Sequence, residues 1–267
     1  MRILIAASLL LATLSSTAFA QEGRPPKAPV VPPPAPAQYT ARTQALPSNV
    51  ELVIPADKKQ VDAYADIYAA MMEGIDHDQI FEQTLESVRQ SYASSPGLAY
   101  LDARNPGVID EAIEAMRPSM RSYSDRVRAE YTPKMIDTMR PLFTEEEARI
   151  IAAFYRHPVG RKVLSGVSAN YTANNAMSSA VNERDVTEDD LRRDSNQTTA
   201  KVMKGMTQDD FATLGLLAMK YPVLMRVGEL SGAMLPVRMQ MENAPLLPSE
   251  EKAIQAAIEG VLSKYDN

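Results

Sequence analysis

Apolar residues recur at spacings of three and four along most of the chain, and this period limits the fold more than any other feature. Such spacing places apolar side chains on one face of an α-helix. A first helix is predicted to start near Ala56, and a second to be capped by Asp76 or Asp78. Short alternating runs of β-branched residues, which would predict strands, do not occur. The sequence therefore predicts an all-α fold, a helical bundle built from αα-hairpins. The predicted stripe of the first helix consists of Val61, Tyr64, Ala65, Tyr68, Met71 and Met72.

Prolines interrupt the helical pattern in the middle of the chain. One apolar seam runs from Ile109 to Val127 and passes through Pro118. Proline inside a helix removes a backbone donor and costs about 3 kcal/mol. We therefore expect two helices, or one bent helix, with Pro118 starting the second piece. Pro133 and Pro141 are expected to divide the following stretch in the same way.

The N-terminus has the pattern of a secretion signal. Arg2 precedes an apolar stretch that ends in the small-x-small site at Ala20, so cleavage is predicted between Ala20 and Gln21. The alternative is an uncleaved anchor, because the apolar run approaches the ~18 residues of a marginal membrane span. The cleavage hypothesis predicts an exported protein, periplasmic or secreted, with no integral membrane span.

Composition excludes several function classes. The chain has no cysteine, which excludes disulfides, thiol catalysis and lipid attachment to an N-terminal cysteine. Its formal net charge of −6 gives no basic surface for nucleic acid and no polybasic patch for a membrane. No spacing typical of a cofactor or metal site is found, so no cofactor is expected.

Residues 21–55 are rich in proline, with eight prolines between Arg24 and Pro47. Proline fixes φ and lacks an amide donor, so this stretch is predicted to be a disordered or extended linker outside the core. It is interpreted as a spacer, and the alternative is a proline-rich ligand for a groove on another protein.

A duplicated pattern is the most informative feature of the second half. Thr144 and Thr207 each follow an apolar residue, precede acids and begin a helix that ends at a Pro-Val pair. Each threonine, with Glu147 or Asp210 three residues later, fits a capping box. The sequence therefore predicts two Thr-capped αα-hairpins, with a third, partial echo of the cap at residues 247–251.

These features divide the chain into predicted units. A helical domain occupies residues 56–182, and the second hairpin and a C-terminal helix occupy residues 205–267. Residues 183–204 form a polar connection. Thr187 could cap one more helix there, and the alternative is a mobile linker.

Residues 142–166 carry a pattern of an aromatic residue, threonine, acids, Phe-Tyr, and then Pro-x-Gly-x-Lys. This pattern resembles the bacterial exported family called domain of unknown function 2059. The second copy departs from it, since it lacks the aromatic pair, the glycine and the lysine, and His157 stands where the family more often has serine. The resemblance implies a secreted or periplasmic helical domain and transfers no catalytic residue.

Few residues suggest chemistry. His77 lies between two acids at a predicted helix start, and His157 precedes the Pro158 hinge, so cap and turn roles are expected for them rather than metal binding. The family-like hairpin contains the candidate binding residues. In one interpretation Phe154 and Gly160 pack the hairpin and Lys162 is solvated; in the other, Tyr155 and Lys162 form a surface patch that contacts a partner.

The sequence leaves three hypotheses for function. The first is a non-catalytic interaction or structural module of the cell envelope, whose partner is an envelope protein. The second is a hydrolase of unfamiliar type that uses Glu or Asp with Tyr, which requires two converging carboxylates. The third is a carrier of a small hydrophobic ligand, which requires an apolar cavity of roughly 300 Å³ or more. The catalytic residues and the oligomeric state are left open.

Overall fold

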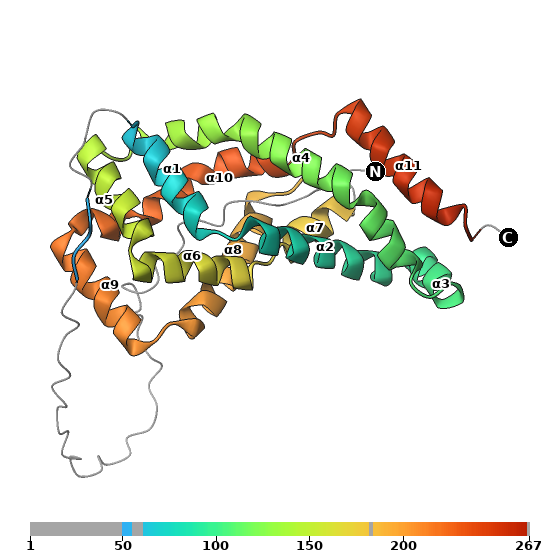
Figure 1. The fold of residues 1–267 in the computed structure, drawn as a ribbon, viewed down its shortest axis with the longest axis horizontal. Coiled ribbons are helices and arrows are strands. Elements are labelled where there is room, and N and C mark those ends of the chain that lie inside the picture. Colours follow the sequence, from blue (N-terminus) through green and yellow to red (C-terminus); the bar gives the residue numbers. More distant parts are fainter. Residues whose placement is uncertain (1–49, 55–60, 182–183, 266–267) are drawn as a thin grey trace, which may run out of the picture.

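Eleven α-helices and one 3₁₀ helix make up the described residues of the computed structural model, which are 50–54, 61–181 and 184–265 (Figure 1). Those residues contain no strand, so the predicted all-α helical bundle is confirmed. The elements are α1 (Ala63–Gly74), α2 (His77–Ser94), α3 (Pro96–Arg104), α4 (Val108–Met139), α5 (Glu145–Arg156), α6 (Pro158–Asn170), α7 (Asn174–Val181), α8 (Glu188–Gly205), α9 (Gln208–Lys220), η1 (Pro222–Arg226), α10 (Gly228–Glu242) and α11 (Pro248–Leu262).

The 32-residue helix α4 is the longest of the described helices and contacts α1, α2, α3, α10 and α11 (Figure 1). Its buried face includes Met116 and Tyr123. The helix continues through Pro118 and Pro133, so of the two predicted alternatives the one of separate helices is wrong and the one of a single helix stands. Both prolines are exposed, and water can therefore reach the carbonyls that lose their donors. Apolar packing of the other face holds the helix together, and only Pro141 lies beyond its end.

The first helix begins later than predicted, at Ala63 rather than near Ala56. Its start is set by Asp62, whose carboxylate accepts a hydrogen bond from the backbone amide of Tyr64 at 2.9 Å. Val61, assigned to the apolar stripe, precedes the helix and is 58% exposed. The rest of α1 packs along α5.

The last part of the predicted linker that the structure describes, residues 50–54, packs on the bundle. Within the extended segment 50–54, Leu52 is buried in the core, and Glu51 pairs with Lys220 of α9 at 3.1 Å. The predicted cleavage site at Ala20 and Gln21 and the prolines up to Pro47 lie outside the described residues. Among the helices that the structure describes, none is long and apolar enough to cross a membrane.

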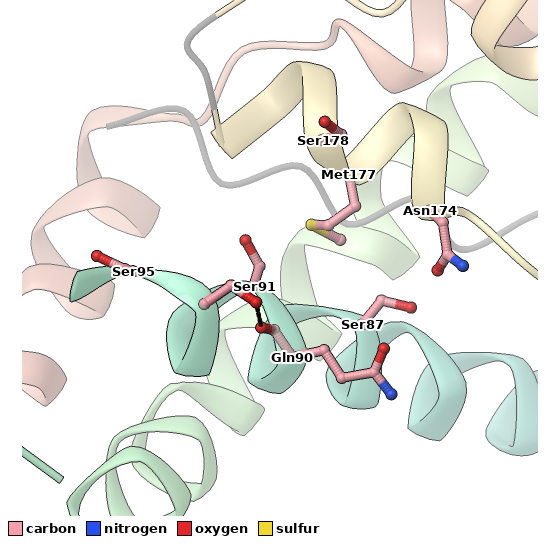
Figure 2. A pocket seen from close by; sticks show the side chains of 8 residues that line it. Ser87, Gln90, Ser91, Ser95, Asn174, Met177 and Ser178 are labelled. Atoms are coloured by element: carbon pink, nitrogen blue, oxygen red, sulfur yellow. Dashed lines mark hydrogen bonds between the residues drawn. The ribbon is translucent and has the colours of Figure 1, made fainter. Parts of the chain in front are cut away.

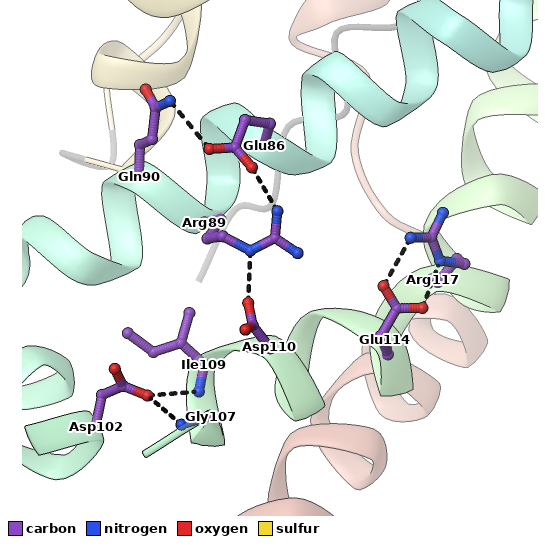
Figure 3. A network of polar contacts seen from close by, with 9 residues as sticks. All are labelled: Glu86, Arg89, Gln90, Asp102, Gly107, Ile109, Asp110, Glu114 and Arg117. Carbon is purple, nitrogen blue, oxygen red and sulfur yellow. Dashed lines mark hydrogen bonds and ion pairs between the residues drawn. The ribbon is translucent and has the colours of Figure 1, made fainter.

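Ion pairs join α2 to α4 along their outer edges (Figure 3). Arg89 of α2 binds Asp110 of α4 at 2.6 Å, and Arg117 of α4 binds Glu82 of α2. At the adjoining corner, the Asp102 carboxylate accepts from the backbone amide of Gly107 at 3.1 Å. Gly107 has φ of 96°, a conformation that favours glycine. This edge of α2 is therefore charged and occupied by structural pairs.

The two predicted threonine caps are both present. Glu147 donates its amide to the Thr144 hydroxyl at 3.2 Å, while the Thr144 amide donates to the Glu147 carboxylate at 2.8 Å. Thr207 and Asp210 repeat this box with distances of 3.2 and 2.7 Å. The segments that follow differ, because α6 starts at once after α5, whereas the 3₁₀ helix η1 separates α9 from α10.

The two Thr-capped segments, α5–α6 and α9–η1–α10, are joined by ion pairs to the acidic residues of their capping boxes. Arg226, the last residue of η1, binds Glu147 at the start of α5 at 3.0 Å. In the opposite direction, Lys162 of α6 binds Asp210 at the start of α9. One apolar cluster includes residues of both segments, so the predicted units 56–182 and 205–267 share a core.

The polar stretch 183–204 contains a helix from residue 188 onward, α8, and is not only a connection. Its first turn is fixed by a capping box between Thr187 and Asp190, with a distance of 3.3 Å from the Asp190 amide to the threonine hydroxyl. A small second apolar cluster lies between α7, α8 and α10, and its members include Leu191 and Leu235. Therefore α8 is an integral layer of the bundle.

Candidate functional site

The aromatic pair of the family-like hairpin is buried. The rings of Phe154 and Tyr155 lie 5.4 Å apart, and Tyr155 is only 3% exposed. The Tyr155 hydroxyl has no hydrogen-bond partner among the described residues, and burial raises its pKa. A partner at the surface cannot reach this ring, so the hypothesis that Tyr155 forms a surface patch with Lys162 is wrong.

Gly160 and Lys162 have structural positions. A Cβ atom on Gly160 would lie 2.0 Å from the carbonyl oxygen of Phe154, so only glycine fits where α6 turns back on α5. Lys162 is exposed and binds Asp210 of the second Thr-capped segment. The candidate residues therefore hold the fold, as the alternative interpretation predicted for Phe154 and Gly160.

Both histidines lie at helix starts. Asp76 caps α2 by accepting from the amide of Gln79 at 2.9 Å, which confirms the predicted cap beside His77. Burial lowers the pKa of His77. His157 caps α6, because its Nδ1 accepts from the amide of Val159 at 3.3 Å. In the described part of the chain no group of three or more His, Asp or Glu residues is placed to hold a metal ion.

A buried carboxylate, Asp194 of α8, holds the start of α7. It accepts from the backbone amides of Asn175 at 3.1 Å and Ala176 at 3.0 Å, and from the Asn175 side chain at 2.7 Å. The first amides of a helix carry partial positive charge and lack intrahelical partners. Asp194 therefore acts as an N-cap for α7 supplied by another helix.

Three more polar side chains accompany Asp194 in the interior: Tyr171 before α7, and Arg238 and Glu242 one turn apart on α10. Burial raises the pKa of Glu242 to about 7, with a smaller contribution from Asp194, while Arg238 opposes the shift. Burial also raises the pKa of Tyr171. The Arg238 Nε atom is buried with no hydrogen-bond partner in the described residues.

This buried cluster contains the two carboxylates and the tyrosine that a hydrolase would need. All four side chains are at most 7% exposed, however, and none lines any of the three pockets described below. A catalytic acid or base must reach the proton that it transfers. The cluster is therefore closed to substrate in this structure.

An accessible pocket lies on the opposite side of α7, where α7 packs against α2 (Figure 2). We call it the α2–α7 groove, and its volume is about 480 Å³, within the ~300–1,000 Å³ of small-molecule sites. Figure 2 shows the Met177 side chain pointing from α7 toward the serines of α2. The lining residues are Ser87, Gln90, Ser91, Ser94, Ser95, Asn174, Met177 and Ser178.

Every lining residue of the α2–α7 groove is uncharged, although charged residues make up 23% of the chain. Met177 is buried at the floor, Ser87 and Ser91 are half-buried, and Asn174 and Ser178 form the exposed rim. The groove therefore presents hydroxyls, amides and one thioether to a ligand, without a fixed charge.

Two other pockets offer less. An apolar one between α2, α3, α4 and α11 holds about 120 Å³, well below the volume expected for a carrier of a hydrophobic ligand. Another, between α4 and α11, holds about 310 Å³ and is lined by Ser119, Ser122 and Ser249 beside Glu250. Glu250 is already bound by Arg126 at 2.7 Å, so that pocket lies over a structural ion pair.

Comparisons with known proteins assign no further role, because no protein-family model, curated protein or solved structure matches the chain. The resemblance over residues 142–166 therefore stays a prediction. Sequence reasoning missed the α2–α7 groove. Its signal was the serine series from Ser87 to Ser95, where an exposed helix would ordinarily carry charges.

Proposed function

We propose that this chain is a non-catalytic interaction module of the cell envelope, and that the α2–α7 groove contacts its ligand. The proposal rests on the fact that the accessible groove and the buried titratable side chains lie in different places. The accessible groove has no titratable side chain, and the buried cluster of titratable side chains has no access. Binding needs only the groove, whereas catalysis would need both features in one place.

Neither of the two histidines of the chain lines the groove. A catalytic serine needs a base within hydrogen-bond reach. His77 lies at the far end of α2, ten residues from Ser87 and therefore ~15 Å along the helix axis. His157 lies at the turn between α5 and α6.

The predicted signal sequence and the resemblance to an exported family support a location in the envelope. The remaining alternative is a hydrolase, because Asp194, Glu242 and Tyr171 do converge. For this alternative, α7 or α10 must open before a substrate can reach the carboxylates.

An experiment with a filled groove separates the two functions. Ser91→Trp places a large ring in the groove. Ser122→Trp places the same ring at an exposed position of α4 and is the matched control. We expect the chain from Gln21 onward and its Ser122→Trp variant to bind isolated bacterial envelope fractions saturably, and Ser91→Trp to bind at least tenfold more weakly. Thermal unfolding confirms that both variants fold.

Turnover is measured on chromogenic ester, amide and glycoside substrates with the same samples. The proposal expects no rate above that of buffer. A rate that Glu242→Gln abolishes would overturn it in favour of the hydrolase. Equal envelope binding by both tryptophan variants would remove the groove as the contact surface.

A further inference from the structure

We infer that the α2–α7 groove binds a short, uncharged saccharide. This inference rests on the proposed function and names its ligand class. The groove combines spaced hydroxyls on one wall, polar groups on the other, both hydrogen-bond donors and acceptors, and no charged side chain.

The α2 wall is a ladder of hydroxyls. Ser87 and Ser91 are four residues apart on α2, which places them on one helix face ~6 Å apart, and Ser95 follows as the C-cap with extended backbone just beyond the helix. This step is comparable to the length of one pyranose ring in a linear saccharide. Ser94 and Gln90 also line this wall and add a hydroxyl and an amide to it.

The α7 wall supplies complementary groups. Asn174 and Ser178 are four residues apart and form its rim, while Met177 lies between them at the floor (Figure 2). A primary amide can donate to one hydroxyl and accept from its neighbour, which suits the vicinal hydroxyls of a sugar. The Met177 thioether offers a small apolar contact for the C–H face of a ring.

Both donors and acceptors remain for a ligand. The Ser87 and Ser94 hydroxyls donate to the carbonyls of Gln83 at 3.0 Å and Gln90 at 2.7 Å, which leaves their oxygens as acceptors. The Gln90 amide nitrogen donates to Glu86 at 3.1 Å, so its carbonyl oxygen is an acceptor too. Donors come from Asn174 and from the Ser95 hydroxyl, which makes no cap hydrogen bond to α3.

The lack of charge selects against other ligands. Phosphorylated or acidic ligands are held by cationic side chains, and none lines the groove. Peptides gain affinity from apolar anchors that fill pockets, and Met177 is the single apolar lining residue. A neutral saccharide requires neither feature, because hydrogen bonds to hydroxyls and amides recognise it.

Amide NMR titration of the chain from Gln21 onward tests the inference. The probes are N,N′,N″-triacetylchitotriose, cellotriose and maltotriose, with the neutral tripeptide N-acetyl-Ala-Ala-Ala amide as comparison. We expect at least one saccharide to shift resonances of residues 87–95 and 174–178, with a dissociation constant on the order of 1 mM.

Single truncations report the contribution of each wall. Ser91→Ala and Asn174→Ala are each expected to weaken saccharide binding roughly fivefold, the effect of one lost hydrogen bond. Ser122→Ala, in the serine pocket between α4 and α11, is the matched control and should leave binding unchanged. These small substitutions leave the fold intact, which the unshifted part of the spectrum verifies.

Different outcomes would contradict the saccharide ligand and the proposed non-catalytic binding function. No saccharide-induced shift at about 20 mM probe, or shifts outside the groove, would overturn the inference. Groove shifts with the tripeptide alone would overturn the saccharide class and leave the binding function standing. Cleavage of a bound trisaccharide would overturn the non-catalytic function and leave the ligand class standing.

Discussion

The two Thr-capped segments, α5–α6 and α9–η1–α10, start with the same capping box and continue differently. In the first, Gly160 lets α6 fold back against α5, and the aromatic pair is buried beside it. In the second, η1 intervenes, and α9 buries only Leu217. Instead, α10 packs on α4 and α8 and carries the buried Arg238 and Glu242.

This difference shows that a capping box determines where a helix starts but not how the following helix packs against it. The cap fixes a first turn through a few polar atoms. A single glycine then decides whether the following helix can approach closely.

Alanine substitution at glycine should have opposite effects in the two segments. Gly160→Ala brings Cβ to 2.0 Å from a backbone oxygen, so α5 and α6 must separate, at a cost of about 3 kcal/mol or more. Gly232→Ala in α10 meets no atom within 4 Å and should stabilise by ~0.5–1 kcal/mol through helix propensity. Urea unfolding measures both. A Gly160→Ala protein as stable as the parent would refute the close approach.

Between pH 5 and pH 8 the second segment should lose stability through a buried carboxyl group, Glu242, whose pKa is raised. The pKa of Glu242 lies at about 7, above its ordinary value of 4.5, so the folded protein keeps a proton that the unfolded chain releases. Stability from this group is therefore complete below pH 4.5 and is lost, by roughly 3 kcal/mol, as pH rises through about 7. Glu242→Gln removes this loss and should be the more stable protein at pH 8.

Unfolding free energies at pH 5 and pH 8 for both proteins give the comparison. Taking the difference between variant and parent cancels the opposite slope from His77, whose pKa is lowered. Glu259→Gln on the exposed side of α11 is the control and should follow the parent at both pH values. A Glu242→Gln variant with the parent's pH profile would show that Glu242 is not buried.

Removal of either threonine cap should cost about the same free energy, but one variant should destabilise the whole fold and the other mainly α9. Thr144→Ala and Thr207→Ala each lose a capping hydrogen bond, worth ~1 kcal/mol. Because α5 is buried and α9 is largely exposed, Thr144→Ala should lower global stability, whereas Thr207→Ala should mainly speed amide hydrogen exchange within α9. Identical exchange patterns in the two variants would argue against the contrast.

The smallest effect is expected for the ion pairs that join the segments. Lys162→Met and Arg226→Met each remove a partly exposed pair, to Asp210 and Glu147 respectively, and should cost less than about 1 kcal/mol. High salt should reduce both effects by screening. A larger loss that salt does not change would mean that these side chains contribute packing and not charge.

Local signals made the helices and their caps predictable. Thr144 and Thr207 each form the predicted box, and Asp76 caps α2. Thr187 also forms a box, at a position where the sequence left open both a helix and a mobile linker. The continuity of α4 through Pro118 was not predictable in the same way. It depends on α2, α10 and α11 packing along the buried face of α4, while the proline faces water.

The candidate site was less visible because both of its parts depend on tertiary contacts. Arg238 and Glu242, four residues apart, have the spacing of a surface ion pair and are buried only because α8 and α10 meet. The groove requires residues 87–95 to lie opposite residues 174–178. The serine series was present in the sequence, but nothing local indicated which helix would face it.

The cap that Asp194 gives to α7 sets an order of events. An eight-residue helix is too short to persist alone, and α7 receives its cap from a residue nineteen positions further along the chain than Asn175. Because the chain is synthesised from its N-terminus, the serines of α2 are made well before α8, which the opposite wall α7 needs for its cap. Under the proposed function, a nascent or truncated chain that ends before residue 194 should therefore not bind the groove ligand.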